Sequence, residues 1–268
     1  TQLVSWALGS TDDPKWTDVL VFGGVILFHE LAARKSPPKG DGSELPRVVG
    51  SAIGLIPTAI GVSGILNWLL DRVYATFTPS TGDADLRIWV ALVIVAAPIW
   101  YYGWWRSWSD TPGTPRNAWA FVVSVGGLAT ALGAGTFIGA QTLSYLIEST
   151  GSAGSHFEFL PVALSLGSVG VLVWWVHRSQ LGTERSASLA TYEYSMTALG
   201  LLAVVGAATG LVAVAFSQDD LVTTGTEAVI GVASVLVVGL FVWRYFWAKA
   251  SDAPREIEAT SMPRRFYL

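Results

Sequence analysis

The sequence predicts an all-α integral membrane protein, built from tandem parallel repeats of a transmembrane helical hairpin. Of its 268 residues, 51% are apolar and only 13% are charged, and the mean hydropathy is +0.48. Soluble domains carry roughly 25% charged residues, so this composition excludes a water-exposed surface of ordinary size. The chain also contains 13 Trp residues, a residue type that concentrates at membrane–water interfaces. Finally, a hydrophobic two-helix pattern recurs about every 72 residues, which indicates duplication of one unit.

Seven segments are long and apolar enough to cross a membrane, since a span needs about 20 such residues. They are residues 18–34, 47–72, 87–107, 116–147, 158–178, 189–216 and 224–248. Loops rich in Gly, Pro, Ser and Thr separate them, and none resembles a soluble domain. The polar segment 253–268 lacks the apolar residues needed for a core of its own, so we predict an extended arm.

Each repeat is predicted to contain a long Gly-rich first helix and a second helix ending in an aromatic residue followed by a base. The first-helix glycines lie 73 residues apart, at Gly54, Gly127 and Gly200. The second-helix aromatics are Phe28, Trp100, Trp174 and Trp243. Complete repeats are therefore predicted at 47–110, 116–182 and 185–252. Residues 1–46 are a partial repeat, the end of a first helix followed by span 18–34, so we expect a further helix before residue 1.

The basic residues predict the orientation. Of the 16 Lys and Arg residues, 13 fall at the ends of second helices, the starts of first helices or the tail. Short loops with an excess of bases face the cytoplasm. We therefore predict a multi-pass protein of the cytoplasmic membrane with a cytoplasmic C-terminus. Because each repeat crosses twice, all repeats have the same orientation.

Aromatic and histidine side chains near the cytoplasmic interface are the weak candidates for a cofactor site. They are Trp100, Trp104, Trp174, Trp243, His29 and His177. The tryptophans are interpreted as an aromatic belt, or as a pocket for a quinone or a carotenoid. Trp104 and Trp105 are about 100° apart on a helix, so both cannot face the same way. The histidines could ligate haem or be structural. They occupy different repeat positions, so a bis-His site is not implied.

Few other residues suggest chemistry. Glu193 and Arg244 are charged at membrane depth on consecutive helices, and we predict a structural ion pair between them. The central thirds of the spans hold no ionisable residue, which argues against an ion pump. Common enzyme motifs are absent. There are no cysteines, which excludes thiolate metal sites, and we predict neither a metal site nor a required cofactor.

Short aromatic motifs resemble an uncharacterised bacterial membrane family built from paired helices. The family's unit opens with an Arg and a Tyr-x-Tyr pair and closes with a V-G-L-P-V-W-x-x-H-W-R-like run. The opening is matched by Tyr192-Glu193-Tyr194 and more loosely by Trp119-Ala120-Phe121, and the closing by residues 97–106 and 173–178. The family's His survives at His177, whereas Gly103 and Phe246 replace it in the other repeats. The resemblance implies an α-helical membrane protein and no established activity.

These features lead to a non-catalytic membrane protein as the expected function, a scaffold or accessory subunit of a membrane complex. Its expected partners are the lipid bilayer and other membrane subunits or further copies of itself, and no nucleic acid. Two alternatives remain open. One is a transporter or channel for an uncharged or lipid-like solute, and the other is a binder of a hydrophobic cofactor.

Overall fold

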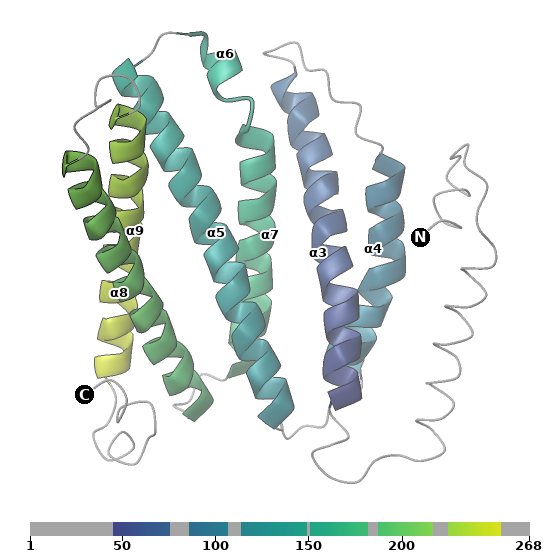
Figure 1. Cartoon of the computed structure of the whole chain (residues 1–268). Coiled ribbons are helices and arrows are strands. Elements are labelled where there is room, and N and C mark those ends of the chain that lie inside the picture. Colours follow the sequence, from purple (N-terminus) through teal and green to yellow (C-terminus); the bar gives the residue numbers. More distant parts are fainter. Residues whose placement is uncertain are drawn as a thin grey trace, which may run out of the picture. The chain divides into compact units, whose positions relative to one another are not determined.

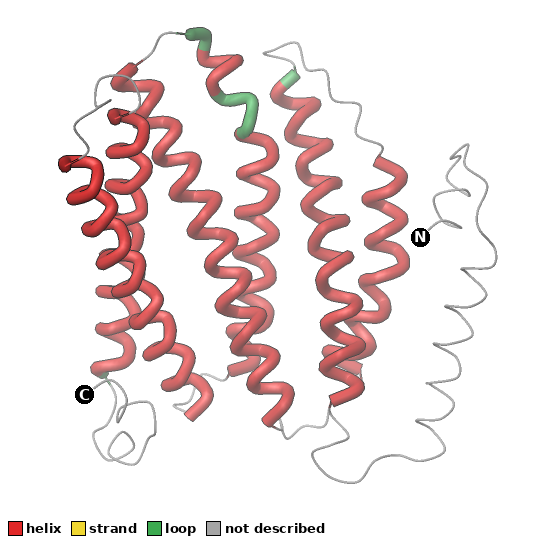
Figure 2. Tube along the Cα trace, viewed as in Figure 1, coloured by secondary structure: helices red, strands yellow, loops and turns green. Residues whose placement is uncertain are grey.

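The computed structural model describes residues 45–75, 86–106, 114–148, 151–181, 187–216 and 225–252. All its described elements are helices (Figure 2). The long ones are α3 (Leu45–Tyr74), α4 (Leu86–Tyr101), α5 (Thr114–Glu148), α7 (Leu160–Arg178), α8 (Ala187–Phe216) and α9 (Gly225–Ser251). Short elements are the π-helical turn η2 (Tyr102–Arg106), α6 (Ala153–His156) and the 3-10 turn η3 (Ser179–Leu181).

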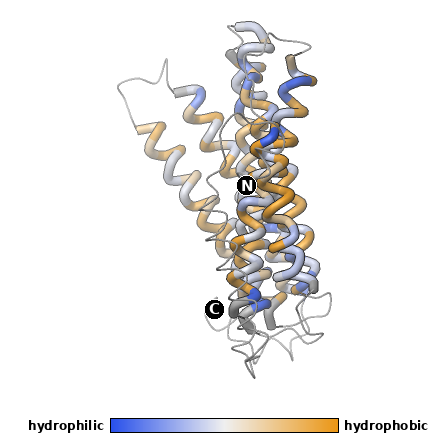
Figure 3. Tube along the Cα trace, turned by 90° about the vertical axis from the view of Figure 1, so that its right-hand side faces the viewer, coloured by the Kyte–Doolittle hydropathy of each residue, from blue (hydrophilic) through white to orange (hydrophobic). Residues whose placement is uncertain are grey.

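Six of the described helices are long and apolar enough to cross a membrane, which agrees with six of the seven predicted spans. Figure 3 shows apolar residues along the helices and the most hydrophilic ones toward their ends. Large side chains such as Phe241 and Leu202 are more than 60% exposed on the outer faces. Exposed apolar side chains of this size fit a hydrocarbon surrounding, since soluble monomers rarely expose large apolar patches. Span 18–34, the partial repeat and the tail 253–268 lie outside the described residues.

The chain divides into two compact units, residues 1–119 and 120–268. In the first unit α3 and α4 lie side by side and run antiparallel (Figure 1). Gly54 packs against Ala96 and Trp100, whereas Gly61, two turns further along α3, packs against Trp89 and Val93 near the start of α4. Contacts further along α3 thus fall earlier in α4, as they must in an antiparallel pair.

The second unit contains two further antiparallel pairs, α5 with α7 and α8 with α9 (Figure 1). In the first pair Gly127 lies against Trp174, and Ala134 against Gly167. In the second pair, Gly200 lies against Trp243 and Gly210 against Val232. These contacts bring backbones together through small residues, the usual way in which helices associate in lipid.

Prolines lie both at the start of a described helix and inside one. Pro161 occupies the first turn of α7, where its missing N–H would be unsatisfied in any case. Pro98 instead lies inside α4, four residues before the π-helical turn η2. Proline removes one backbone hydrogen bond from a helix interior, and a π-turn is one of the local adjustments that such a helix can make.

Candidate functional site

The same close contact joins the two helices of all three pairs. A Cβ atom added to Gly54 would lie 2.7 Å from Trp100 Cα, one added to Gly127 would lie 2.6 Å from the Trp174 backbone nitrogen, and one added to Gly200 would lie 2.9 Å from Trp243 Cα. Real Cβ atoms do not approach backbone atoms this closely. Three of the predicted cofactor candidates, Trp100, Trp174 and Trp243, are therefore the residues at which the two helices of a pair meet.

A fully buried hydroxyl group lies three residues before each of these glycines. Ser51, Ser124 and Thr197 are each 0% exposed. Ser124 Oγ donates to the Ala120 carbonyl oxygen at 2.6 Å, and Thr197 Oγ1 donates to the Glu193 carbonyl oxygen at 2.8 Å. Because the hydroxyls of Ser124 and Thr197 bond within their own helices, they add small polar groups to the tight contact without an unsatisfied donor.

The residue three positions after each contact tryptophan is also buried. It is Gly103 in η2, His177 in α7 and Phe246 in α9. A Cβ atom at Gly103 would lie 2.8 Å from the Ser51 backbone nitrogen. No side chain fits there, which explains why the family-like histidine is missing from this position. His177 is 0% exposed, and its Nδ1 lies 2.8 Å from the Val173 carbonyl oxygen, to which it donates.

Aromatic residues of the predicted belt alternate between inward and outward orientations. Trp104 is 0% exposed whereas Trp105, the next residue, is 43% exposed. The expectation that the two rings face different ways is confirmed. Trp175 is likewise 64% exposed beside the partly buried Trp174. The outward rings belong to the surface that faces lipid, and the inward rings belong to the contacts between helices.

Tyr192, near the start of α8, is the centre of a buried aromatic cluster in the second unit. Its side chain is 0% exposed. Its hydroxyl accepts a hydrogen bond from Trp174 Nε1 at 2.8 Å, and its ring makes edge-on contacts with Phe121 and Phe246. The Arg178 guanidinium lies 5.4 Å from the ring centroid. Tyr192 thus ties α8 to helices α5, α7 and α9 at one level.

Trp119, located 73 residues before Tyr192, has a comparable position in the first unit. Its Nε1 donates to Ser51 Oγ of α3 at 3.3 Å. One turn earlier, the Arg116 guanidinium lies 5.5 Å from the ring of Trp104. The first two turns of α5 therefore contact the helix pair that precedes it, as Tyr192 does through Trp174.

The two residues of the predicted ion pair differ in burial. Glu193 of α8 is 7% exposed, whereas Arg244 of α9 is exposed. The register that places Trp243 against Gly200 sets Arg244 roughly 9 Å from the level of Glu193 along the helix axis. No ion pair joins them in the described part of the chain, so this pair stays a prediction. His29 lies outside the described residues.

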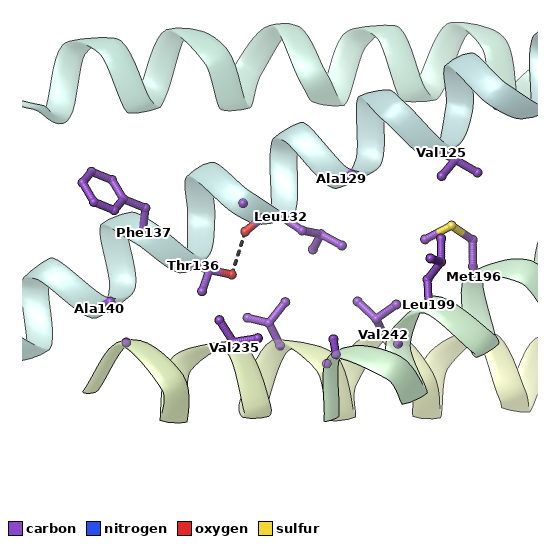
Figure 4. A pocket seen from close by; sticks show the side chains of 16 residues that line it. Val125, Ala129, Leu132, Thr136, Phe137, Ala140, Met196, Leu199, Val235 and Val242 are labelled. Atoms are coloured by element: carbon purple, nitrogen blue, oxygen red, sulfur yellow. Dashed lines mark hydrogen bonds between the residues drawn. The ribbon is translucent and has the colours of Figure 1, made fainter. Parts of the chain in front are cut away.

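An apolar groove of about 580 Å³ runs between α5, α8 and α9 in the second unit. Figure 4 shows Val125, Leu132 and Thr136 of α5 on one side and Leu199, Val235 and Val242 on the other. Thr136 is the one polar side chain among the described lining residues, and its hydroxyl donates to the Leu132 carbonyl oxygen at 2.7 Å. The groove thus suits an apolar guest. None of the predicted tryptophan or histidine candidates is among the described residues that line it.

Two features of this region were missed by sequence analysis, the buried hydroxyls and the groove. The hydroxyls carry a signal, since Ser51, Ser124 and Thr197 repeat at the same 73-residue spacing as the glycines. The groove carries none, because its Val, Ala and Gly residues are also those that pack helix against helix.

A family model described as a domain of unknown function (DUF5671) matches residues 44–157. This segment includes α3, α4, η2, α5 and α6. The match is consistent with the resemblance to an uncharacterised membrane family. No curated protein and no solved structure shows significant similarity to the chain.

Proposed function

We propose that this chain is a non-catalytic protein of the cytoplasmic membrane that serves as a scaffold or accessory subunit of a membrane complex. It is built from three tandem copies of one helical hairpin, α3/α4, α5/α7 and α8/α9, all in the same orientation. The observation that carries the proposal is the contact of Gly54, Gly127 and Gly200 with a tryptophan backbone in each pair. Tryptophans that serve as contacts between helices are better suited to a structural role than to a reaction.

Open glycines on α5 support a role in binding other membrane helices. Around Gly126, Gly133, Gly135 and Gly139 an added Cβ would meet nothing within 4 Å. Gly135 and Gly139 form a small-xxx-small pair, which allows the backbone of another helix to approach closely. The described part of the chain leaves space beside these glycines, which is expected if a partner covers them.

The groove between α5, α8 and α9 supports a second candidate function, the binding of a lipid-like molecule or a hydrophobic cofactor. Its lining is apolar, and its volume of about 580 Å³ falls within the range of small-molecule sites. In this alternative the hairpins form the walls of a binding site for a quinone, a carotenoid or a lipid chain.

Photo-crosslinking distinguishes the two functions. A photoreactive amino acid is placed at Gly135, which faces away from the groove, and in a second variant at Gly133, which lines it. The scaffold function predicts one discrete protein adduct from position 135 in membranes. Small lipid-like adducts from position 133, with no protein adduct from position 135, would instead support the binder. A probe at Gly206 of α8, where an added Cβ also meets nothing within 4 Å, is the internal control.

The proposed orientation has its own test in this cysteine-free chain. Ser152, located before α6, is expected outside the cytoplasm, and Ser107, which lies outside the described residues, inside it. Single cysteines at these positions are labelled in whole cells with a thiol reagent that does not cross membranes. We expect labelling at position 152 only, because the bases predict the cytoplasmic side. Labelling at position 107 alone would reverse the orientation.

A further inference from the structure

The outward face of α9 near its C-terminal end combines bases with apolar side chains. Residues three or four apart share a helix face, and this face is formed by Leu240, Phe241, Arg244, Tyr245 and Ala248. Phe241 is 66% exposed and Tyr245 is 47% exposed, and Arg244 is exposed between them. Together with Lys249 and Asp252 they line one shallow surface pocket.

Arg244 brings a positive charge into the membrane-crossing segment Thr226–Ser251. It lies seven residues before the end of that segment, which is about 10 Å along the helix. In the described part of the chain no carboxylate forms an ion pair with it. Glu193 is buried within the helix packing, and Asp252 lies two turns further along α9. A guanidinium at this depth requires an anion or must reach toward the headgroups.

The composition of the pocket indicates which anion fits. Among the described residues that line the pocket are two cations, Arg244 and Lys249, which attract an anion, and one carboxylate, Asp252. The guanidinium presents a planar set of donors that matches two phosphate oxygens. The rings of Phe241 and Tyr245 lie nearly parallel, 17° apart with centroids at 6.2 Å. They form an apolar platform beside Arg244, with Phe241 toward the membrane centre and Tyr245 one residue nearer the helix end.

We propose that this face of α9 binds an anionic phospholipid. Arg244 and Lys249 hold its phosphate, and one acyl chain lies along Leu240 and the Phe241–Tyr245 platform. The site depends on the placement of α9 in a membrane and not on the scaffold function. It differs from general contact with headgroups because the Arg244 guanidinium, which has no carboxylate partner among the described residues, favours a net negative lipid over a zwitterionic one.

The test uses the purified full chain in detergent micelles that contain either phosphatidylglycerol or phosphatidylcholine with the same acyl chains. Ligand that binds the native state raises the unfolding midpoint. We expect phosphatidylglycerol to raise it by about 2–4 °C over phosphatidylcholine. The variant Arg244→Gln/Lys249→Gln should lose most of this difference. The control Arg72→Gln/Arg87→Gln removes the same charge from exposed residues of α3 and α4 and should keep the difference.

Equal midpoints in the two lipids for the unmodified chain would overturn the proposal. The same holds if Arg244→Gln/Lys249→Gln keeps the full difference, or if the control loses it equally. Glycerol 3-phosphate added to phosphatidylcholine micelles should not reproduce the shift, and a shift from it would assign the site to a free phosphate. If the glutamine variant does not fold, Arg244→Lys/Lys249→Arg, which keeps both charges, must retain the preference, and its loss there would also contradict the site.

Discussion

Replacing Tyr192 with alanine is expected to lower the free energy of unfolding by about 3–5 kcal/mol, the range found when a buried aromatic side chain is removed. The ring of Tyr192 is 0% exposed and contacts Phe121 and Phe246. Its removal leaves a cavity where α8 meets α5, α7 and α9. The measurement is thermal or denaturant unfolding of the purified protein in detergent.

A milder variant separates the hydroxyl from the ring. Tyr192→Phe keeps the aromatic packing but removes the acceptor of Trp174 Nε1, and we expect a loss of about 1–3 kcal/mol. The matched control is Tyr101→Phe, because Tyr101 is 56% exposed and should tolerate the change. Equal stability of Tyr192→Phe and the unmodified protein would show that the hydrogen bond contributes nothing.

Replacing Gly200 with alanine is expected to lower the free energy of unfolding by about 1–3 kcal/mol, as overpacking typically does. The new Cβ would lie 2.9 Å from Trp243 Cα, so α8 and α9 must separate to admit it. The same sign is expected for Gly54→Ala and Gly127→Ala, whose neighbours are the backbones of Trp100 and Trp174. Unfolding midpoints of the variants in detergent measure the effect.

Gly206→Ala is the control for this experiment. Gly206 lies in the same helix as Gly200, but an added Cβ meets nothing within 4 Å. Alanine has the higher helix propensity, by about 1 kcal/mol, so this variant should be neutral or slightly more stable. If Gly200→Ala and Gly206→Ala behave alike, the tight contact does not limit stability.

Hydropathy alone predicted most of the described fold. Length and apolar composition predicted α3, α4, α5, α7, α8 and α9 within a few residues, because a membrane-crossing helix must satisfy both. The 100° turn per residue predicted that Trp104 and Trp105 face different ways, and the structure confirms it. The π-helical turn η2 was not predicted, because the backbone there adjusts to both Pro98 and the close approach of Gly103 to α3.

In the candidate site, the membrane depth of a residue, which the sequence predicts, was not enough to predict its contacts. Glu193 and Arg244 were matched by their distance from the loops, which gives depth but neither helix rotation nor register. In the structure one side chain is buried and the other is exposed, and packing of Gly200 on Trp243 sets that register. For the same reason the tryptophans could be assigned to one interface from the sequence but not to separate helix pairs.

The tight glycine contacts have a consequence for the order in which the protein is made. The residues that meet are 43 to 47 positions apart, at Gly54 with Trp100, Gly127 with Trp174, and Gly200 with Trp243. The entropic cost of bringing together two residues at this small sequence separation is low. Each pair can therefore close as soon as its second helix leaves the ribosome and enters the bilayer, before the next pair has been synthesised. Trp119 and Tyr192 are synthesised after the pairs that they contact, so we expect the protein to assemble in whole pairs and not in single helices.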